Sequence, residues 1–271
     1  MLTDQQIPSV LGPMAAPHDR LPFEELQRRY NFRATSDWQA LFVRLLIDEC
    51  RRIGPGCRAL DIGCGHGIGR KPAYTAAVRD AVGELWGLEP DTGEMPTADL
   101  FHQFQHATME TAVLPEAHFD IAYSFMVVEH VADPRSYMDA VARCLKPGGI
   151  HFFITVNGAH YFAKCAGAMR RLRLEEIVLR LLRGRAEVDE YHYPVQYKMN
   201  TPRVLDRLAT QTGFNAPDYV FVEERGPEPY MKGPLRLLWH ALNVKRRIVK
   251  NQRSLLALYC RMQRASNRGV S

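Results

Sequence analysis

The sequence predicts an α/β fold in which helices cover both faces of a mostly parallel sheet. A short apolar run at 58–62 has the length of a buried strand, and it leads straight into a glycine-rich turn. An Ala-rich segment at 71–82 follows with the composition of a helix. Strand-like and helix-like patterns then alternate up to residue 156, which is typical of a doubly wound sheet.

The glycine-rich turn is the most informative part of the chain. Residues 59–69 read Ala-Leu-Asp-Ile-Gly-Cys-Gly-His-Gly-Ile-Gly. Glycine tolerates positive φ and lets the backbone approach a ligand closely, so Gly63, Gly65 and Gly67 predict a cradle for a small molecule.

The register of these glycines argues against a dinucleotide. A G-x-G-x-x-G turn would need its third glycine at Ile68 or Arg70. Asp61 also places a carboxylate beside the turn, which suits a cationic or hydroxyl-bearing ligand better than a phosphate.

The stretch at 59–69 resembles the first motif of class I S-adenosylmethionine-dependent methyltransferases. Their cofactor carries an amino group and a sulfonium and has no phosphate. The resemblance implies a Rossmann-like, seven-stranded mixed sheet with helices on both faces. It also implies S-adenosyl-L-methionine as the cofactor, bound by Asp61, Gly63, Cys64, Gly65, Gly67, Glu89, Pro90, Glu110, Thr111, Ser124 and Phe125.

Further motifs of the family follow in order. Residues 85–89 resemble its second strand and end at Glu89, where the family binds the ribose hydroxyls; Asp91 is the near alternative. Leu114-Pro115 resembles the loop before the fourth strand. Counting back five residues from Pro115 gives Glu110 as the acid near the adenine amino group, or Thr111 if the register slips by one.

The fourth and fifth strands are expected at 121–125 and 150–156, with the family's turn at 145–149 between them. Ligands of open α/β sheets bind beyond the carboxyl ends of the strands. Ser124 and Phe125 are therefore expected near the methionyl end of the cofactor. The candidate catalytic residues follow the same two strands and are Glu129, His130 and Tyr161.

The segment 126–131 resembles the ubiquinone-pathway O-methyltransferases. In that group an acid three positions before the Glu-His pair helps to bind a divalent metal, and here this position is Met126. We therefore predict no metal site. His130 is either a general base or a histidine that satisfies local hydrogen bonds. The aromatic stretch around His192 and Tyr193 could line an acceptor pocket.

The predicted domain organisation is an N-terminal arm at 1–35 and a methyltransferase domain at 36–271. Four prolines punctuate the arm, and Tyr30 and Arg33 could contact the cofactor. A helix is expected from Ser36, its N-cap, with one apolar face of Trp38, Leu41, Phe42, Leu45 and Leu46. Insertions are expected at about 158–200 and 226–253. Thr201-Pro202 should start a helix ending near Gly213, and the last strands should be antiparallel at 219–222 and 255–260.

Composition is that of an ordinary soluble globular protein. The chain has 271 residues, of which 46% are hydrophobic and 24% charged. Its six cysteines show no CxxC pair or zinc spacing. The N-terminus lacks the pattern of a signal peptide, and no apolar run is long enough to span a bilayer. We therefore expect a cytoplasmic protein with reduced thiols.

Charge is divided unevenly along the chain. Residues 229–271 hold ten Lys and Arg and no Asp or Glu, whereas residues 1–228 carry a net charge of −5. In this segment, helical spacing places Leu235, Leu238, Trp239 and Leu242 on one apolar face. A basic cluster follows it, made of Lys245, Arg246, Arg247 and Lys250. The pattern fits either peripheral contact with an anionic membrane or a helix packed on the sheet with a solvated basic side. Nucleic acid is not expected, because no RNA-binding module or base-methylation motif accompanies the charge.

The sequence therefore predicts a cytoplasmic S-adenosylmethionine-dependent methyltransferase. Its expected acceptor is a small molecule or a lipid- or glycan-linked group, methylated at oxygen. Two alternatives stay open, a methyltransferase for RNA or protein and a non-catalytic scaffold that binds the cofactor.

Overall fold

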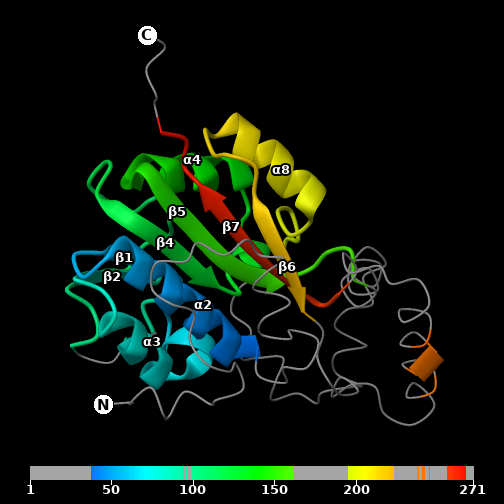
Figure 1. Ribbon diagram of the computed structural model, residues 1–271, viewed down its shortest axis with the longest axis horizontal. Helices are drawn as coiled ribbons and strands as arrows, with labels where there is room; N and C mark the ends of the chain where they lie inside the picture. Colours follow the sequence, from blue (N-terminus) through cyan, green and yellow to red (C-terminus); the bar gives the residue numbers. More distant parts are fainter. Residues whose placement is uncertain are drawn as a thin grey trace.

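The computed structural model has the α/β architecture predicted from the sequence (Figure 1). It describes residues 38–93, 96, 99–160, 195–222, 237, 240, 241, 244 and 255–266. Its seven-stranded sheet has the order β3-β2-β1-β4-β5-β7-β6, and β7 runs antiparallel to both of its neighbours. The strands are β1 (Arg58–Ile62), β2 (Glu84–Leu88), β3 (Gln103–Gln105), β4 (Phe119–Phe125), β5 (Leu145–Val156), β6 (Asp218–Val222) and β7 (Ala257–Gln263).

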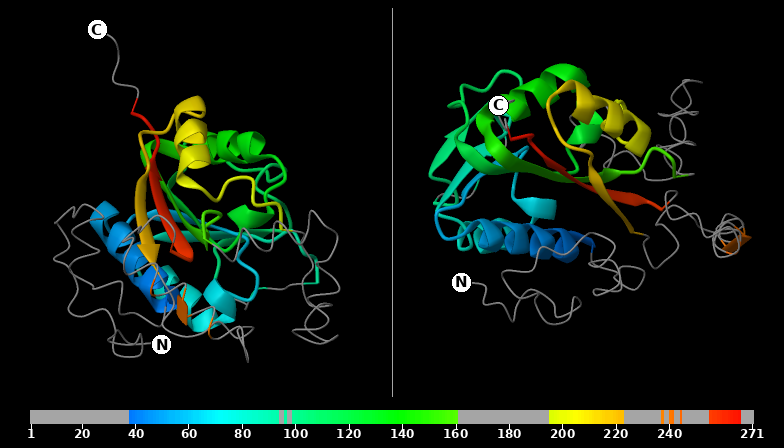
Figure 2. Two further views of the ribbon diagram at one scale, coloured as in Figure 1. Left: turned by 90° about the vertical axis from the view of Figure 1, so that its right-hand side faces the viewer. Right: turned by 45° about the horizontal axis from the view of Figure 1, so that its top comes forward.

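Helices cover both faces of this sheet (Figure 2). One layer contains α2 (Trp38–Ile53) and α3 (Pro72–Arg79), and the other contains α4 (Pro134–Cys144) and α8 (Pro202–Gln211). Two short 3-10 helices, η2 (Ile68–Arg70) and η3 (Val128–His130), follow β1 and β4.

Successive residues along a strand point to opposite faces of the sheet, and they belong to two apolar cores, one under each helix layer. On β5, Phe152 faces the α2 side, where its ring stacks on Phe42 at a centroid distance of 5.1 Å. The next residue, Phe153, belongs to the core on the α4 side. Burial on both faces explains why the central strands read as continuous apolar runs.

Several predicted elements are confirmed. The predicted apolar face of α2 is buried at Leu41, Phe42, Leu45 and Leu46, whereas Ser36 and the side chain of Trp38 lie outside the described residues. Thr201 is the N-cap residue of α8 and Pro202 opens the helix, although the Thr201 side chain makes no capping hydrogen bond. The helix ends at Gln211, just before Gly213 with its φ of 77°.

Other boundaries differ from the prediction. The helix expected at 71–82 ends at Arg79. The turn expected at 145–149 is part of the long strand β5. The register between β4 and β5 shifts between Phe119 and Ile121. β7 covers 257–263 rather than 255–260, because it pairs with β5 from Ile150 to Val156. The short strand β3 was not predicted.

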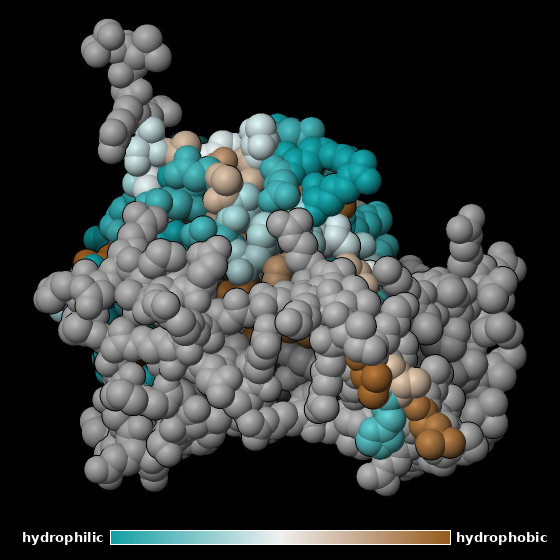
Figure 3. Space-filling view, turned by 45° about the vertical axis from the view of Figure 1, so that its right-hand side comes forward, coloured by the Kyte–Doolittle hydropathy of each residue, from teal (hydrophilic) through white to brown (hydrophobic). Residues whose placement is uncertain are grey.

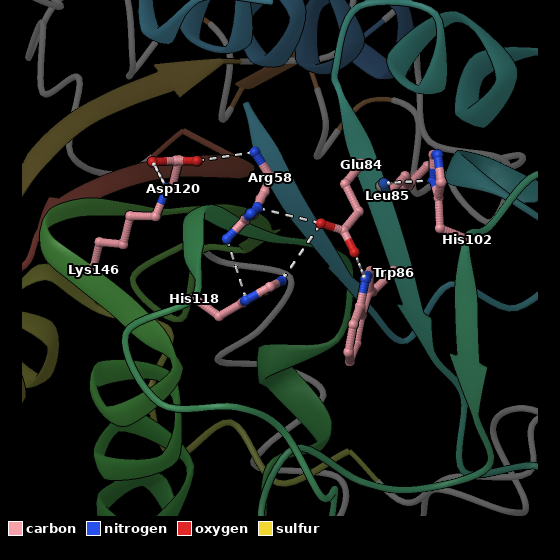
Figure 4. Close-up of polar contacts among 8 residues, drawn as sticks. All are labelled: Arg58, Glu84, Leu85, Trp86, His102, His118, Asp120 and Lys146. Carbon is pink, nitrogen blue, oxygen red and sulfur yellow. Dashed lines mark hydrogen bonds and ion pairs between the residues drawn. The ribbon is translucent and has the colours of Figure 1, made fainter. Parts of the chain in front are cut away.

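Ion pairs and hydrogen bonds join the amino ends of the parallel strands (Figure 4). The Glu84 carboxylate accepts a 2.6 Å hydrogen bond from Trp86 Nε1 and lies 3.3 Å from Arg58 Nε. Asp120 accepts from the backbone N–H of Arg58 at 2.9 Å and from Lys146 Nζ at 2.7 Å. These contacts stabilise the edge of the sheet opposite to the glycine-rich turn.

A second polar cluster joins α2 to the last two strands. Arg261 of β7 is buried, and its Nε donates to Glu49 Oε1 of α2 at 2.9 Å. Its Nη1 lies 3.5 Å from Asp218 Oδ2 of β6, and Arg52 also pairs with Glu49. A buried charge needs such partners, so these contacts fix α2 on the sheet.

The predicted N-terminal arm lies outside the described residues, as do most of the two predicted insertions. None of the helices in the described ranges has the length and apolar character needed to cross a membrane.

Candidate cofactor and active site

The glycine-rich turn follows β1 and has the left-handed backbone that the sequence predicts. The φ angles of Gly63, Gly65 and Gly67 are 71°, 42° and 98°. A Cβ on Gly63 would lie 2.5 Å from Val127 Cγ2, and one on Gly67 would lie 2.9 Å from the backbone of Pro72. Glycine is therefore required at both positions, because any side chain would disturb the loop after β4 or the start of α3.

Asp61 lies beside this turn and is 2% exposed. Its Oδ2 is buried without a hydrogen-bond partner. The pKa of this carboxyl is raised to about 8, mainly by burial. The charge of Glu89 raises it further, and the nearby Tyr123 hydroxyl partly opposes the shift, although the two groups do not reach hydrogen-bonding geometry. A cationic ligand group would compensate the buried carboxylate.

Glu89 follows β2 directly and is fixed against the glycine-rich turn. Its Oε2 accepts from the N–H of Gly65 at 2.9 Å, and its Oε1 accepts from the N–H of Asp91 at 3.0 Å. The Asp91 carboxylate instead accepts from the N–H of Gly93 at 2.8 Å. Of the two acids considered for the ribose hydroxyls, Glu89 is therefore the one that contacts the turn.

Two further predicted cofactor residues flank these acids. Cys64 is buried, and burial raises the pKa of its thiol well above its usual range. Its N–H and that of Gly63 donate to the carbonyl of Leu88 at 2.9 and 2.8 Å, which ties the turn to the end of β2. Pro90 is half-buried next to Glu89.

The two residues predicted near the adenine lie in the loop after β3. Glu110 is half-buried, and Thr111 is exposed, with its hydroxyl 3.1 Å from that of Thr108. The side chain of Gln105 closes this loop by pairing with both backbone groups of Val113, at 2.9 and 3.1 Å. Sequence reasoning missed Gln105, since a glutamine at the end of a short strand carries no local signal.

Ser124 and Phe125 form the carboxyl end of β4. Ser124 is fully buried and pairs in register with Phe153 of the α4-side core, so its side chain belongs to the α4 side of the sheet. Phe125 is half-buried and packs edge-on against Phe42 at 5.3 Å. Met126 follows with a φ of 57° and donates its N–H to Ile154 at 3.0 Å.

The structure brings two of the three candidate catalytic residues together in η3. Glu129 is 3% exposed, and its Oε2 accepts from the Thr155 hydroxyl at 2.8 Å. Burial raises the pKa of the Glu129 carboxyl to about 7. His130 is half-buried and caps the turn by donating its N–H to Val127 at 2.9 Å.

The structure does not describe the remaining predicted residues of the acceptor side. Tyr161, His192 and Tyr193 fall outside the described residues. Within the described ranges, His, Cys, Asp and Glu side chains form no group of three or more that could hold a metal ion.

A family model matches most of the chain. The model of a family described as "Methyltransferase domain" matches residues 26–216. The chain belongs to this methyltransferase family. Its fold is that of the S-adenosylmethionine-dependent methyltransferases, as the sequence predicts.

Relatives and solved structures support the assignment. The methyltransferase is 32% identical over 173 residues to the ubiquinone biosynthesis O-methyltransferase of Ruegeria sp. (strain TM1040), covering 60% of this chain and 62% of that protein. It is 30% identical over 178 residues to the corresponding protein of Psychrobacter arcticus, again covering 62% of the relative. The chain thus spans about three fifths of these relatives' length.

The fold is also that of a geranyl diphosphate methyltransferase solved in complex with S-adenosylmethionine. The TM-score is 0.52 at 15% identity, over 90% of this chain and 88% of that one.

S-adenosylmethionine is the cofactor of this methyltransferase class, and the described residues fit it. The buried Oδ2 of Asp61 provides an acceptor for a cationic amino group. Glu89 offers carboxylate oxygens at the turn, and a Cβ on Gly65 would lie 3.7 Å from Glu89 Oε2, between the backbone and this carboxylate.

Proposed function

We propose that this methyltransferase transfers a methyl group from S-adenosylmethionine to an oxygen of a small-molecule or a lipid- or glycan-linked acceptor. The observation that carries the proposal is the glycine-lined cradle with two buried acids, in which Asp61 has an unpaired oxygen and Glu89 is bound to Gly65. Oxygen is favoured as the acceptor atom because the relatives at 30 to 32% identity are named O-methyltransferases.

Each predicted residue has a role in this proposal. The bound cofactor supplies an electrophilic methyl group, and the protein has to align it with the acceptor oxygen. Asp61 would bind the amino group and Glu89 the ribose hydroxyls. The other cofactor contacts would come from Gly63, Cys64, Gly65, Gly67, Pro90, Glu110, Thr111, Ser124 and Phe125.

His130 is the proposed general base. A hydroxyl acceptor gains nucleophilicity when its proton is removed, and an imidazole titrates near neutral pH. His130 lies at the carboxyl end of β4, where the crevice of an open α/β sheet is expected. Glu129 and Tyr161 are the other candidates. Because Met126 replaces the acid of the metal-binding relatives, we propose that transfer needs no divalent metal, and EDTA should leave it unchanged.

We also propose a cytoplasmic location with peripheral membrane contact through the basic C-terminal segment. In that segment Leu237 and Val244 are 75% and 55% exposed. Apolar, brown surface is visible at the lower right of the face shown in Figure 3. Apolar side chains beside a cluster of lysines and arginines favour an anionic lipid surface. Flotation with anionic and with neutral vesicles tests this proposal. If the protein floats with neither kind of vesicle, the alternative of a helix packed on the sheet is favoured. The predicted apolar face at 235–242 otherwise lies outside the described residues.

The experiment that tests the reaction uses methyl-labelled cofactor. The protein is incubated with it and with separated fractions of metabolites, lipids, glycans, RNA and protein, and the labelled product is analysed for an O-methyl group. Label in a metabolite, lipid or glycan fraction supports the proposal. Label in RNA or protein supports the first alternative, and cofactor binding without any transfer supports a scaffold.

A further inference from the structure

Two buried side chains on neighbouring strands each carry an oxygen without a hydrogen-bond partner among the described residues. They are Asp61 of β1, at Oδ2, and Tyr123 of β4, at its hydroxyl. Asp61 is 2% exposed, and Tyr123 is fully buried. A polar atom that is buried without a partner costs free energy, so two of them on adjacent strands indicate a place where a ligand completes the hydrogen bonding.

The two side chains lie on the same face of the sheet. β1 and β4 are parallel neighbours, and their register pairs Asp61 directly with Tyr123. Tyr123 belongs to the apolar core on the α2 side, as does Ala59, which precedes Asp61 by two residues on β1. Because side chains alternate between the two faces of a strand, Asp61 points to the same side as Ala59 and Tyr123.

The Tyr123 ring is packed against α2, and its hydroxyl lies among polar groups near the glycine-rich turn. The ring centroid is 6.4 Å from that of Phe42. Burial raises the pKa of the Tyr123 hydroxyl well above its usual range, and the nearby side chains of Asp61, Cys50 and Cys64 raise it further. The hydroxyl therefore keeps its proton throughout the physiological pH range and is available as a hydrogen-bond donor.

Few other groups act on the ionisation of Asp61. Among the described residues Glu89, which follows β2, carries the one charge that shifts its pKa, and this charge raises it. Burial raises the pKa of the Cys64 thiol in the turn, and contact with a second buried thiol raises that of Cys50 on α2, so both stay neutral. Tyr123 is the one described side chain that lowers the Asp61 pKa, which means that it favours the ionised carboxylate.

We propose that Tyr123 is a positioning residue of the cofactor site, whose hydroxyl donates a hydrogen bond to the Asp61 carboxylate when Asp61 binds the cationic amino group of the cofactor. Asp61 releases its proton to solvent on binding, and the hydroxyl then stabilises the charge that forms. The pair thereby selects nucleoside ligands that carry an amino group. This inference rests on the proposed function, because it assumes the cofactor named there.

The test compares Tyr123→Phe with Tyr259→Phe by titration calorimetry between pH 6 and 9. Tyr259 is a matched control, because it is also fully buried in the α2-side core and its ring lies 6.5 Å from that of Phe42. It stands on β7, which β5 separates from β4. The ligands are S-adenosylhomocysteine, which keeps the amino group, and 5′-methylthioadenosine, which lacks the amino and carboxylate groups.

The proposal predicts a loss of affinity that depends on pH and on the ligand. At pH 6 Tyr123→Phe should bind S-adenosylhomocysteine about ten-fold more weakly than the wild type, because Asp61 loses the hydrogen bond that favours its ionised form. This ratio of Kd values should fall to about two at pH 9, above the wild-type Asp61 pKa of about 8, and the titration of the ligand itself cancels in it. Tyr259→Phe with either ligand, and Tyr123→Phe with 5′-methylthioadenosine, should stay within about two-fold of the wild type at every pH.

The same substitution in an Asp61→Asn background separates this role from simple packing. Because Asn does not titrate, Tyr123→Phe should change the Kd there by the same factor at every pH. Urea unfolding shows whether each variant is folded and gives a second readout. Tyr123→Phe raises the pKa of the folded-state Asp61 carboxyl, so the fall in stability should continue to higher pH than in the wild type, and this difference should vanish in the Asn background.

Two results would overturn the positioning role. One is a Kd ratio that is the same at pH 6 and pH 9, since that would reflect packing or no role at all. The other is an equal loss of affinity for 5′-methylthioadenosine, because that ligand has no amino group for Asp61 to bind. A wild-type protein that binds S-adenosylhomocysteine but labels no fraction would refute the proposed function instead, and the Kd ratios would still decide this inference. A wild type that binds neither ligand would overturn both.

Discussion

Replacing Asp61 with Asn should make the protein more stable and its cofactor site weaker. Burial raises the Asp61 pKa from 3.8 to about 8, so the native state keeps this carboxyl protonated at pH 7 while the unfolded chain has it ionised. A folded-state pKa above the unfolded value means that stability is greatest below about pH 4 and falls as pH rises towards 8. With about 1.4 kcal/mol for each pH unit, the loss by pH 7 is on the order of 4 kcal/mol.

Asn resembles the protonated carboxyl but does not titrate. The free energy of unfolding of Asp61→Asn, measured with urea at pH 5, 7 and 8, should therefore exceed that of the wild type by a margin that grows with pH. Asp133→Asn is the control, because hydrogen bonds from Ser136 lower the pKa of that exposed carboxyl and its contribution is constant over this range. S-adenosylmethionine should bind Asp61→Asn about ten- to a hundred-fold more weakly.

The reasoning fails if Asp61→Asn is no more stable than the wild type at pH 7 and 8, or if the difference between them does not depend on pH. Separately, if Asp61→Asn binds S-adenosylmethionine as tightly as the wild type does, Asp61 does not bind the cofactor.

Three further predictions concern the turn, η3 and α2. Gly63→Ala should weaken S-adenosylmethionine binding at least ten-fold by titration calorimetry, because its Cβ would collide with the loop after β4, whereas Gly213→Ala, with a similar φ of 77° and open space around it, should bind normally. The Glu129 pKa is raised to about 7, so its contribution to stability falls from about pH 4.5 to 7; Glu129→Gln should flatten that part of the urea-derived pH profile, and an unaltered slope would contradict the assignment. Arg261→Ala should lower the free energy of unfolding by about 3 kcal/mol or more, because it leaves Glu49 buried without its partner from β7; a loss under 1 kcal/mol would show that Arg52 alone suffices.

Local patterns in the sequence were enough to predict most of the fold. β1 occupies the predicted range because an apolar run of strand length ends at glycines. The start of α8 follows from Thr201-Pro202, since proline fits the first turn of a helix. The cradle was predictable for the same reason, because positive φ at Gly63, Gly65 and Gly67 is a local property.

Features that depend on distant contacts were not predictable. β3 has only three residues, and its strand conformation comes from pairing with β2. β5 starts at Leu145, earlier than predicted, where it pairs with Phe119 of β4. The bounds of β7 follow from its pairing with β5, which lies about a hundred residues earlier. The hydrogen bonds from Thr155 to Glu129 and from Asn157 to Leu255 join residues 26 and 98 positions apart, and a buried asparagine looks in sequence like any loop asparagine. The pKa shift of Asp61 likewise requires the burial that only the folded sheet provides.

Titration of the full chain with S-adenosylmethionine tests the central claim most directly, with NAD as the comparison ligand. The glycine register and the two buried acids predict one S-adenosylmethionine site per chain and no binding of NAD. Absence of heat with S-adenosylmethionine at high ligand concentration, or tighter binding of NAD, would contradict the assignment of the cradle.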